Sequence, residues 1–349
     1  MPDVDMNTSK FVRTLKERKE NTHREHQNIR DFDPKGQGKF KVGSAGVIDM
    51  SADATREFLG MIGVPKPFYD RCEFDDDLQT TIVKKFIGNS ENFRVHPVVI
   101  EEKGVPTIVG FWDDNKPFAY LYDMFERVND AVNKYTNGNH EVTLKAGKSE
   151  YSQDTFYDAR GGIFSWTSES VIKSAKVGDI TEGGVRLMAS DWMRFDPAVS
   201  YYANRLICTN GMVSHRNVEF EIKGLKTEQV LDNIGKSAEE IMKTVGVHLL
   251  DPFVNTNNHK VENPIGMARS MIKDHGIKKR VGERFIENVD RMVNADNGPY
   301  TMYDIINCLT SVQNDDNIKW NDRELVQFLG GIEVVEHQDR CRQCHHILN

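Results

Sequence analysis

The stretch of residues 162–224 constrains the fold more than any other part of this chain. Its β-branched and aromatic residues gather in short segments that Gly, Asp and Pro turns separate: IFSWTS, ESVIKSAKV, GGVRLMASDWM, AVSYYANRLICT and VEFEIKG. Short apolar segments between turn residues at this spacing are typical of β-hairpins. We therefore expect a curved antiparallel sheet with helices packed on it, which is an α+β fold.

The hydrophobic period changes from two to near four after Thr227. Val230, Ile234 and Ile241 share one face of a helix that would begin at Thr227. Residues 265–295 have the pattern of one or two further helices. Two more helix starts have capping-box spacing: Thr301 with Asp304, and Asn321 with Glu324. The C-terminal third is therefore predicted to be mostly helical.

With 349 residues, the chain is long enough for about two domains. We expect a charged arm over residues 1–44, an α+β core domain over 45–250 and a helical region over 251–349 that ends in a Cys/His tail. Little apolar surface is available in the arm, whose glycine-rich end indicates a loop. The arm is expected to be solvated or disordered, or to become ordered on a nucleic acid or a partner.

Charge is segregated along the chain, which has a formal net charge of −8. Residues 1–42 carry 10 Lys and Arg against 7 Asp and Glu, whereas residues 49–80 carry 3 against 8. The overall acidity excludes a strongly cationic, histone-like protein. It leaves room for a local basic patch, which is sufficient for nucleic-acid binding.

The hydropathy pattern gives no sign of a membrane partner. No run of about 18 apolar residues occurs, and the first residues are polar and charged, unlike a secretory signal. Cysteines are sparse, and their number, five, is odd. These features favour a reducing cytoplasm, which is the host cytoplasm if a phage encodes the chain.

The usual enzyme motifs are missing from the sequence. It contains no Walker phosphate loop, no G-x-G-x-x-G, no H-E-x-x-H and no G-x-S-x-G. We therefore expect no nucleotide cofactor, and a non-enzymatic role is favoured over catalysis. A metal-dependent hydrolase would need carboxylates and histidines to converge, and no spacing singles out the available ones: Asp75–Asp77, His96, Asp113, Asp114 and Asp123.

The C-terminal tail has the most local chemical signal. Cys341 and Cys344 form one Cys-x-x-Cys knuckle, and His337 and His345 lie close enough in sequence to complete a tetrahedral zinc shell. Further ligands could come from Cys308, Cys72, His259 or His346. The same letters match the c-type haem attachment motif, which requires export and is less favoured. A flexible tail without metal is the alternative.

One block resembles a known family. Gly184-x-Arg186, Ser190-Asp191 and the run from Arg205 through Cys208 to Asn210-Gly211 are similar to an uncharacterised phage- and plasmid-associated family of unknown function. The segment ATREFLGMIGVPKPFYDRC is similar to that family's leader. The resemblance covers about residues 45–250 and omits the Cys/His tail. It implies a phage or mobile-element origin and supplies no catalytic residue.

The leading functional hypothesis is a nucleic-acid-associated accessory protein that binds or anneals single-stranded DNA in phage replication or recombination. A sheet backed by helices with a basic surface is similar to the general plan of single-strand annealing proteins. Basic residues would hold phosphates. The candidates are Arg186, Arg194 and Arg205 in the β-rich region, with the aromatic Trp192, Tyr201 and Tyr202 beside them, and Lys273, Lys278, Lys279, Arg280 and Arg284 in a predicted helix.

Each of these features also has a purely structural interpretation. Basic residues on a helix are commonly a solvated face, and aromatic residues in a sheet commonly pack in the core. The alternative function is a non-enzymatic phage protein that binds a host protein or forms a homo-oligomeric assembly. The acidic net charge fits that alternative at least as well. Salt-sensitive binding of single strands would discriminate between the two.

Overall fold

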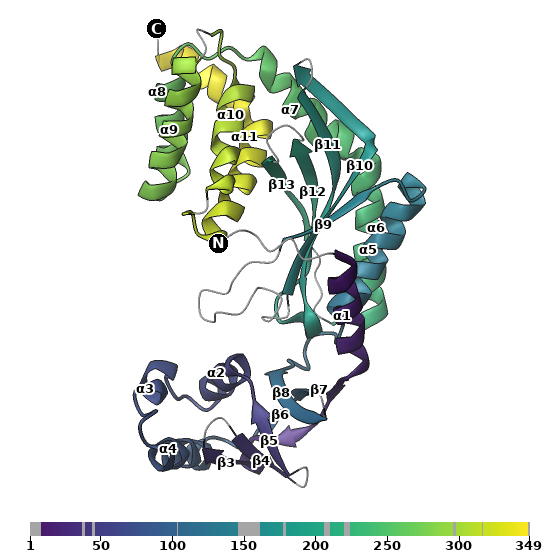
Figure 1. Ribbon diagram of the computed structural model, residues 1–349, viewed down its shortest axis with the longest axis vertical. Coiled ribbons are helices and arrows are strands. Elements are labelled where there is room, and N and C mark those ends of the chain that lie inside the picture. The colour runs from purple at the N-terminus through teal and green to yellow at the C-terminus, as the bar shows by residue number, and fades with distance from the viewer. Residues whose placement is uncertain are drawn as a thin grey trace.

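The strands predicted over residues 162–224 form one antiparallel sheet. The computed structural model describes residues 8–36, 39–43, 46–102, 104–145, 161–176, 179–205, 210–219, 224–295, 298–315 and 317–347. Within these ranges five strands pair in the order β13-β12-β11-β10-β9. They are β9 (Glu141–Lys145), β10 (Gly161–Lys176), β11 (Asp179–Ser190), β12 (Ala198–Arg205) and β13 (Asn210–Glu219). The chain has an α+β fold, as expected (Figure 1).

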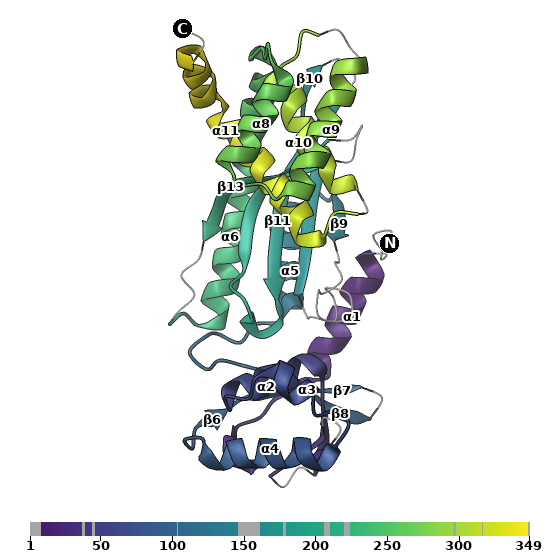
Figure 2. The same cartoon turned by 90° about the vertical axis from the view of Figure 1, so that its left-hand side faces the viewer.

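Helices cover both faces of this sheet, which we call the second sheet because another sheet precedes it in the chain. On one face lie α5 (Leu121–Thr136) and α6 (Thr227–Val245), and on the other lie the C-terminal helices (Figures 1 and 2). Phe164, Trp166, Val185 and Leu187 alternate along β10 and β11 with residues of the opposite face and are fully buried. The Phe125 ring of α5 lies 4.9 Å from Phe164. The apolar residues that alternate in the sequence therefore form the face of the sheet that α5 and α6 cover.

The C-terminal third is helical, as predicted. It contains η3 (Gly246–Leu250), α7 (Asp251–Asn255), η4 (Thr256–Asn258), α8 (Pro264–Asp274), α9 (Lys279–Ala295), α10 (Met302–Thr310), η5 (Ser311–Asn314) and α11 (Trp320–Ile347). The Thr301–Asp304 capping box is confirmed. The Asn321–Glu324 start is wrong, because α11 begins at Trp320 and both residues lie inside it. Among the described residues, no helix combines the length and apolarity needed to cross a bilayer.

The predicted boundary at residue 250 does not separate two bodies. Leu249 and Leu250 precede that boundary and Phe253 follows it, yet all three belong to the same buried cluster as Trp166. The Phe253 ring lies 4.8 Å from Tyr303 of α10. Residues 251–347 therefore continue the core of the second sheet instead of forming a region of their own.

The N-terminal residues form a smaller unit, the N-terminal unit, which contains the first sheet and is not the predicted arm. After α1 (Thr8–Glu20), the elements are β1 (Thr22–Arg24), β2 (Gln27–Asn28), η1 (Ile29–Asp31), β3 (Phe32–Gly36), β4 (Lys39–Val42), β5 (Val47–Met50), α2 (Ala52–Met61), α3 (Lys66–Asp70), α4 (Asp76–Asn89), β6 (Arg94–Val95), β7 (Pro97–Glu102) and β8 (Val105–Phe111). Within the described ranges six strands pair in the order β1-β7-β8-β5-β4-β3. The pair β5–β8 is parallel and the other pairs are antiparallel.

The few apolar residues of the predicted arm are what anchor it. Ile29, Phe32, Phe40 and Val42 are at most 2% exposed and lie in the core of the N-terminal unit. The Phe32 and Phe40 rings each lie 5.0 Å from Phe58 of α2. The prediction of a solvated arm is wrong because it considered how few apolar residues the arm has and not how they are spaced. Those residues alternate with charges on short strands, so one face of each strand is apolar.

Side-chain caps fix the starts of two helices in the N-terminal unit. The Ser51 side chain caps α2 by accepting a hydrogen bond from the Ala54 N–H at 3.2 Å. Asp75 caps α4 in the same way through the Leu78 N–H at 2.9 Å. Asn210-Gly211, a pair that often forms a tight turn, instead begins β13 and pairs with β12. The connecting residues 206–209 lie outside the described ranges.

Two adjacent glycines allow β11 to approach its neighbours. A Cβ on Gly183 would lie 3.0 Å from Leu250 and 3.1 Å from Val171. A Cβ on Gly184 would overlap the backbone carbonyl of Trp166 on β10. The Gly-Gly pair therefore matches the close packing of β11 against β10 on one side and the helices on the other.

Replacing Gly184 by Ala should destabilise the protein by roughly 2–4 kcal/mol, because the new methyl group meets backbone that has no space to move. The control is Gly88→Ala in α4, where a Cβ would meet nothing within 4 Å. That change should stabilise the fold by about 0.5–1 kcal/mol through the higher helix propensity of Ala. Thermal and urea unfolding measure both. A neutral Gly184→Ala would contradict the register of β10 and β11.

Candidate nucleic-acid interface

Four of the predicted basic residues gather at the turn between α8 and α9, which we call the α8–α9 turn (Lys273–Arg280). The left-handed Gly276, with φ +60°, ends α8, and the buried Ile277 secures the turn through its N–H, which donates to the Ile272 carbonyl at 2.9 Å. Lys273 lies in the last turn of α8, and Lys278, Lys279 and Arg280 lie at the start of α9. The fold therefore gathers these cations at the beginning of one 17-residue helix.

The cations of the α8–α9 turn are largely open to solvent. Lys279 is 89% exposed, and its Nζ lies 3.8 Å from Glu283. Lys278 is 67% exposed and pairs with Asp322 at 2.6 Å. Lys273 and Arg280 are exposed, and within the described part of the chain no ion pair holds either of them. The charges of Lys273, Lys279 and Arg280 are therefore available to an external anion.

Helix electrostatics reinforce this site. The first turn of α9 contains no acidic residue. Helices usually favour carboxylates in that position, because their unpaired N–H groups give the first turn a partial positive charge. Lys279 and Arg280 add full positive charges to it. An anion at the α8–α9 turn would offset both, which is why phosphates bind readily at such helix starts.

The opposite face of α9 holds the helix in place. Val281, Phe285 and Val289 are buried at helical spacing. Gly282 lets α8 approach, because a Cβ there would lie only 3.3 Å from Ile272. The apolar stripe and the cationic turn therefore occupy different parts of one amphipathic helix. The predicted basic cluster lies partly at a solvent-exposed helix start and partly where α9 meets Asp315.

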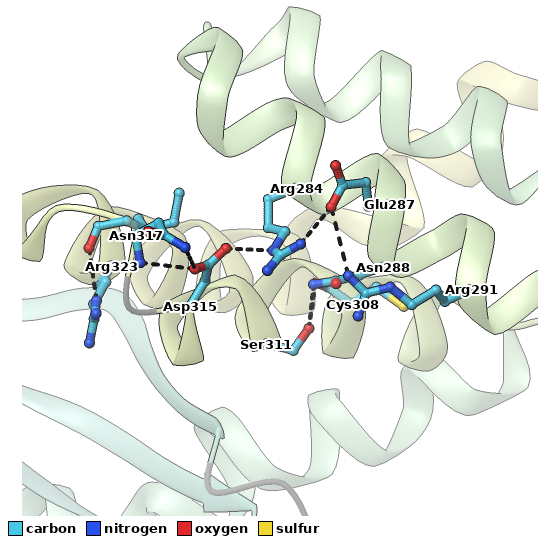
Figure 3. A network of polar contacts seen from close by, with 10 residues as sticks. Arg284, Glu287, Asn288, Arg291, Cys308, Ser311, Asp315, Asn317 and Arg323 are labelled. Atoms are coloured by element: carbon cyan, nitrogen blue, oxygen red, sulfur yellow. Dashed lines mark hydrogen bonds and ion pairs between the residues drawn. The ribbon is translucent and has the colours of Figure 1, made fainter. Parts of the chain in front are cut away.

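Arg284 lies further along α9, and its side chain is 34% exposed. Its guanidinium donates to Asp315 at 2.5 Å and to Glu287 at 2.6 Å (Figure 3). Asn288, one turn further along α9, donates to the Ser311 hydroxyl at 2.8 Å and to the Cys308 carbonyl at 3.2 Å. These contacts join α9 to α10 and to the loop after it. Arg284 is thus held by carboxylates in a structural network, which leaves it poorly placed for a phosphate.

Arg186 lies inside the protein. Its side chain is 6% exposed, forms an ion pair with Glu324 of α11 and donates to Gln327 at 3.1 Å. Burial lowers the pKa of Arg186 to about 10. The aromatic Tyr201 and Tyr202 are also buried, as their structural interpretation anticipates. Arg186 therefore tethers α11 to the second sheet and does not reach a surface where DNA could bind.

Arg194 and Trp192 lie where the two units meet. They line a cleft of about 490 Å³ together with α2 and the end of β8. Arg194 pairs with Glu57 of α2, which also accepts a hydrogen bond from the Phe111 N–H at 3.0 Å. The other cations of the cleft also face carboxylates: Arg56 with Asp53, and Lys116 with Asp196. Such a neutral cleft favours a phosphate much less than the α8–α9 turn does.

The predicted basic residues therefore do not form one face. Arg194 contacts the N-terminal unit, whereas α9 lies among the C-terminal helices, apart from that unit (Figure 1). The side chain of Arg205 lies outside the described residues. Sequence reasoning missed Arg269, an exposed cation one helical turn before Lys273 on the same face of α8. The four-residue spacing of Arg269 and Lys273 was the available signal.

The acidic and histidine residues considered for a hydrolase are dispersed. His96 lies 3.2 Å from Asp114 and 2.7 Å from His26, Asp123 pairs with Lys19, and Asp75 caps α4. Among the described residues, no group of three or more His, Cys, Asp and Glu side chains could hold a metal ion. The side chains of Cys341, Cys344, His337 and His345 lie outside the described residues, although the α11 backbone runs through all four positions.

Comparison with protein-family models, curated proteins and solved structures finds no match to this chain.

Asp315 gives the Arg284 network a predictable pH dependence. Burial acts to raise its pKa, but hydrogen bonds from Asn317 and the charge of Arg284 outweigh burial and lower it below the ordinary value of 3.8. A lowered folded-state pKa stabilises the fold above about pH 4, and this contribution disappears as the pH falls through the folded-state pKa.

Asp315→Asn should therefore reduce the free energy of unfolding at pH 7 by on the order of 1 kcal/mol. The difference between wild type and variant should shrink below about pH 4. Urea unfolding across pH measures it, with Asp290→Asn, an exposed position on α9, as the control. A difference that stays constant down to the lowest accessible pH would refute the role of the Asp315 charge.

Proposed function

We propose that this chain is a non-enzymatic accessory protein that binds single-stranded nucleic acid through the α8–α9 turn. The observation that carries the proposal is the exposed group of Lys273, at the end of α8, with Lys279 and Arg280 at the start of α9, whose first turn contains no acid. Cations and free helix N–H groups at one position are a common way to hold phosphate oxygens. The resemblance of residues 45–250 to a phage- and plasmid-associated family supports a role in phage replication or recombination in the host cytoplasm.

The described surface favours backbone contacts over base recognition. Trp192 is 2% exposed and Tyr201 is 8% exposed, so neither ring is available at the surface for a base to stack on. Binding through phosphates alone is independent of sequence and strongly dependent on salt. The proposed activity is therefore sequence-independent association with a strand, as replication and annealing factors require.

Lys279→Glu with Arg280→Glu should weaken binding to a fluorescent oligodeoxythymidine by at least about tenfold at about 50 mM salt. The slope of log K against log salt should become shallower by about 1.4, since each lost phosphate contact removes about 0.7. Fluorescence anisotropy measures both. Lys278 stays unchanged because it pairs with Asp322.

The matched control carries the same change of charge elsewhere. Lys226→Glu with Lys236→Glu alters two exposed lysines at the start and in the middle of α6. This control should keep most of the affinity if the α8–α9 turn is the binding site. Equal losses in the two variants would mean that only net charge matters, and no binding by wild type at low salt would reject the proposed function.

The Cys/His tail is proposed as a structural zinc site. Positions 337, 341 and 344 are spaced by four and three residues along α11, so they fall on one face of the helix, and position 345 follows directly in sequence. Two thiolates and two imidazoles are a common tetrahedral zinc shell that leaves no position open for a substrate.

Protein purified without a histidine tag should contain about one zinc ion per chain, and Cys341→Ser with Cys344→Ser should remove it. The metal content should decrease as the pH falls, because protons compete for the thiolates and imidazoles. Mass spectrometric metal analysis measures this. Wild type that stays essentially free of zinc after supplementation would leave the tail as a helix without metal.

A further inference from the structure

We infer that the N-terminal unit carries a docking surface for the α8–α9 turn of a second copy of this chain. The surface consists of Phe68, Glu73, Phe74, Asp77 and Leu78, from α3, the turn after it and the start of α4, and we call it the acidic–aromatic surface. It goes beyond the proposed function, because it concerns association of the protein with itself.

Phe74 is the centre of this surface. Its side chain is 82% exposed, the highest value among the exposed large hydrophobic residues of the described chain. The backbone that presents it is nevertheless fixed, since the Glu73 N–H donates to Asp70 and the Asp75 N–H to Cys72, each at 3.1 Å. Gln79 adds a buried bond from α4 to the Tyr69 carbonyl. A rigidly held, exposed aromatic ring is the type of residue that anchors protein interfaces.

The neighbours of Phe74 enlarge the apolar area. Phe68 is 48% exposed and Leu78 is 37% exposed, and both lie within six residues of Phe74. The core of the N-terminal unit does not need these side chains, because the rings of Phe32, Phe40, Phe58 and Phe111 already fill it. Exposed apolar groups with a polar surround mark interaction sites.

The charges around this surface decide which partner fits. Residues 66–78 contain five Asp and Glu against two Lys and Arg. Within the described part of the chain, no ion pair neutralises Glu73 or Asp77. A symmetric contact would bring two such acidic surfaces together, and the repulsion of like charges opposes it. The partner surface must therefore be cationic.

The same chain carries a cationic surface of matching kind. Residues 263–291 contain seven Lys and Arg against four Asp and Glu, and the α8–α9 turn presents their exposed part. The α8–α9 turn lies at the end of the C-terminal helices where α11 begins, since Lys278 pairs with Asp322. In both views these helices stand apart from α2–α4 (Figures 1 and 2). The two complementary surfaces therefore lie apart on one molecule, which favours a head-to-tail contact between copies. Such a contact leaves a free surface of each kind and can continue into longer assemblies.

The contact has two consequences that a measurement can separate. It should weaken with salt, because it joins opposite charges across a solvated interface. It should also compete with single-stranded nucleic acid, because both use the α8–α9 turn. A variant changed only at Phe74 should lose self-association and keep nucleic-acid binding, so the failure of one proposal is distinguishable from the failure of the other.

The first experiment is sedimentation velocity of the full chain at low salt over a concentration series. Wild type should form species larger than one chain, and Phe74→Ser should weaken the association by at least about tenfold. Val47→Ser is the matched control: Val47 is 57% exposed in the same unit, but on β5 it alternates with the buried Ile48 and so faces away from the helices. Wild type that remains a single chain at every concentration, or equal losses in both variants, would overturn the inference.

The second experiment exchanges charges between the two surfaces. Glu73→Lys with Asp77→Lys reverses the acidic–aromatic surface, and Lys279→Glu with Arg280→Glu reverses the turn; thermal melts verify that both variants fold. Each variant alone should lose association. In their equimolar mixture, the lysines on the acidic–aromatic surface of the first variant meet the glutamates on the turn of the second, and the two unchanged surfaces also attract each other. The mixture should therefore regain part of the association. Failure of the mixture to associate, while Phe74→Ser still abolishes wild-type assembly, would show that the turn is not the partner surface.

Discussion

The insertion of Trp192 into the N-terminal unit is the contact on which the arrangement of the two units depends. Its ring packs against Val98, Ile100 and Val109 on the face of the first sheet that α2–α4 leave uncovered. The backbone reaches this position only with positive φ at Trp192 and Met193. Such a conformation is costly for residues with side chains and persists where surrounding contacts fix it. Here the backbone N–H of Trp192 donates to the Ala119 carbonyl at 2.7 Å, and the Asp191 carboxylate accepts from the Leu121 N–H at 2.8 Å.

The second sheet is held differently on its two faces. Aromatic and aliphatic packing against α5 and α6 fixes one face, whereas a buried polar tether from Arg186 to Glu324 and Gln327 fixes α11 on the other. Buried ion pairs contribute less to stability than their charges suggest, because both groups lose hydration. Their geometric demands are strict, however, so this tether specifies where α11 lies. The C-terminal helices, and with them the α8–α9 turn, take their position from that docking.

The proposed activities follow from charge that the core does not use. Arg186, Arg194 and Arg284 are basic residues that the fold pairs with carboxylates, and they hold elements together. Lys279 and Arg280 remain open to solvent at a helix start, and Phe74 remains exposed in the N-terminal unit. The available cations and the acidic–aromatic surface thus lie on different parts of the molecule. Nucleic-acid binding and head-to-tail association are both proposed on that basis.

The sequence by itself determined those features that depend on residues close together in the chain. The period-2 pattern over 162–224, the caps at Ser51 and Thr301 and the change to helix at Thr227 all depend on contacts within a few positions, so they could be predicted. Only the tertiary structure decided which basic residues are free, because Arg186 meets Glu324 across 138 positions of chain and Arg194 meets Glu57 across 137. The same holds for the predicted arm, whose Phe32 and Phe40 acquire a core only when Phe58 and Phe111 fold against them. Burial is a property of pairs distant in sequence, and periodicity alone does not contain it.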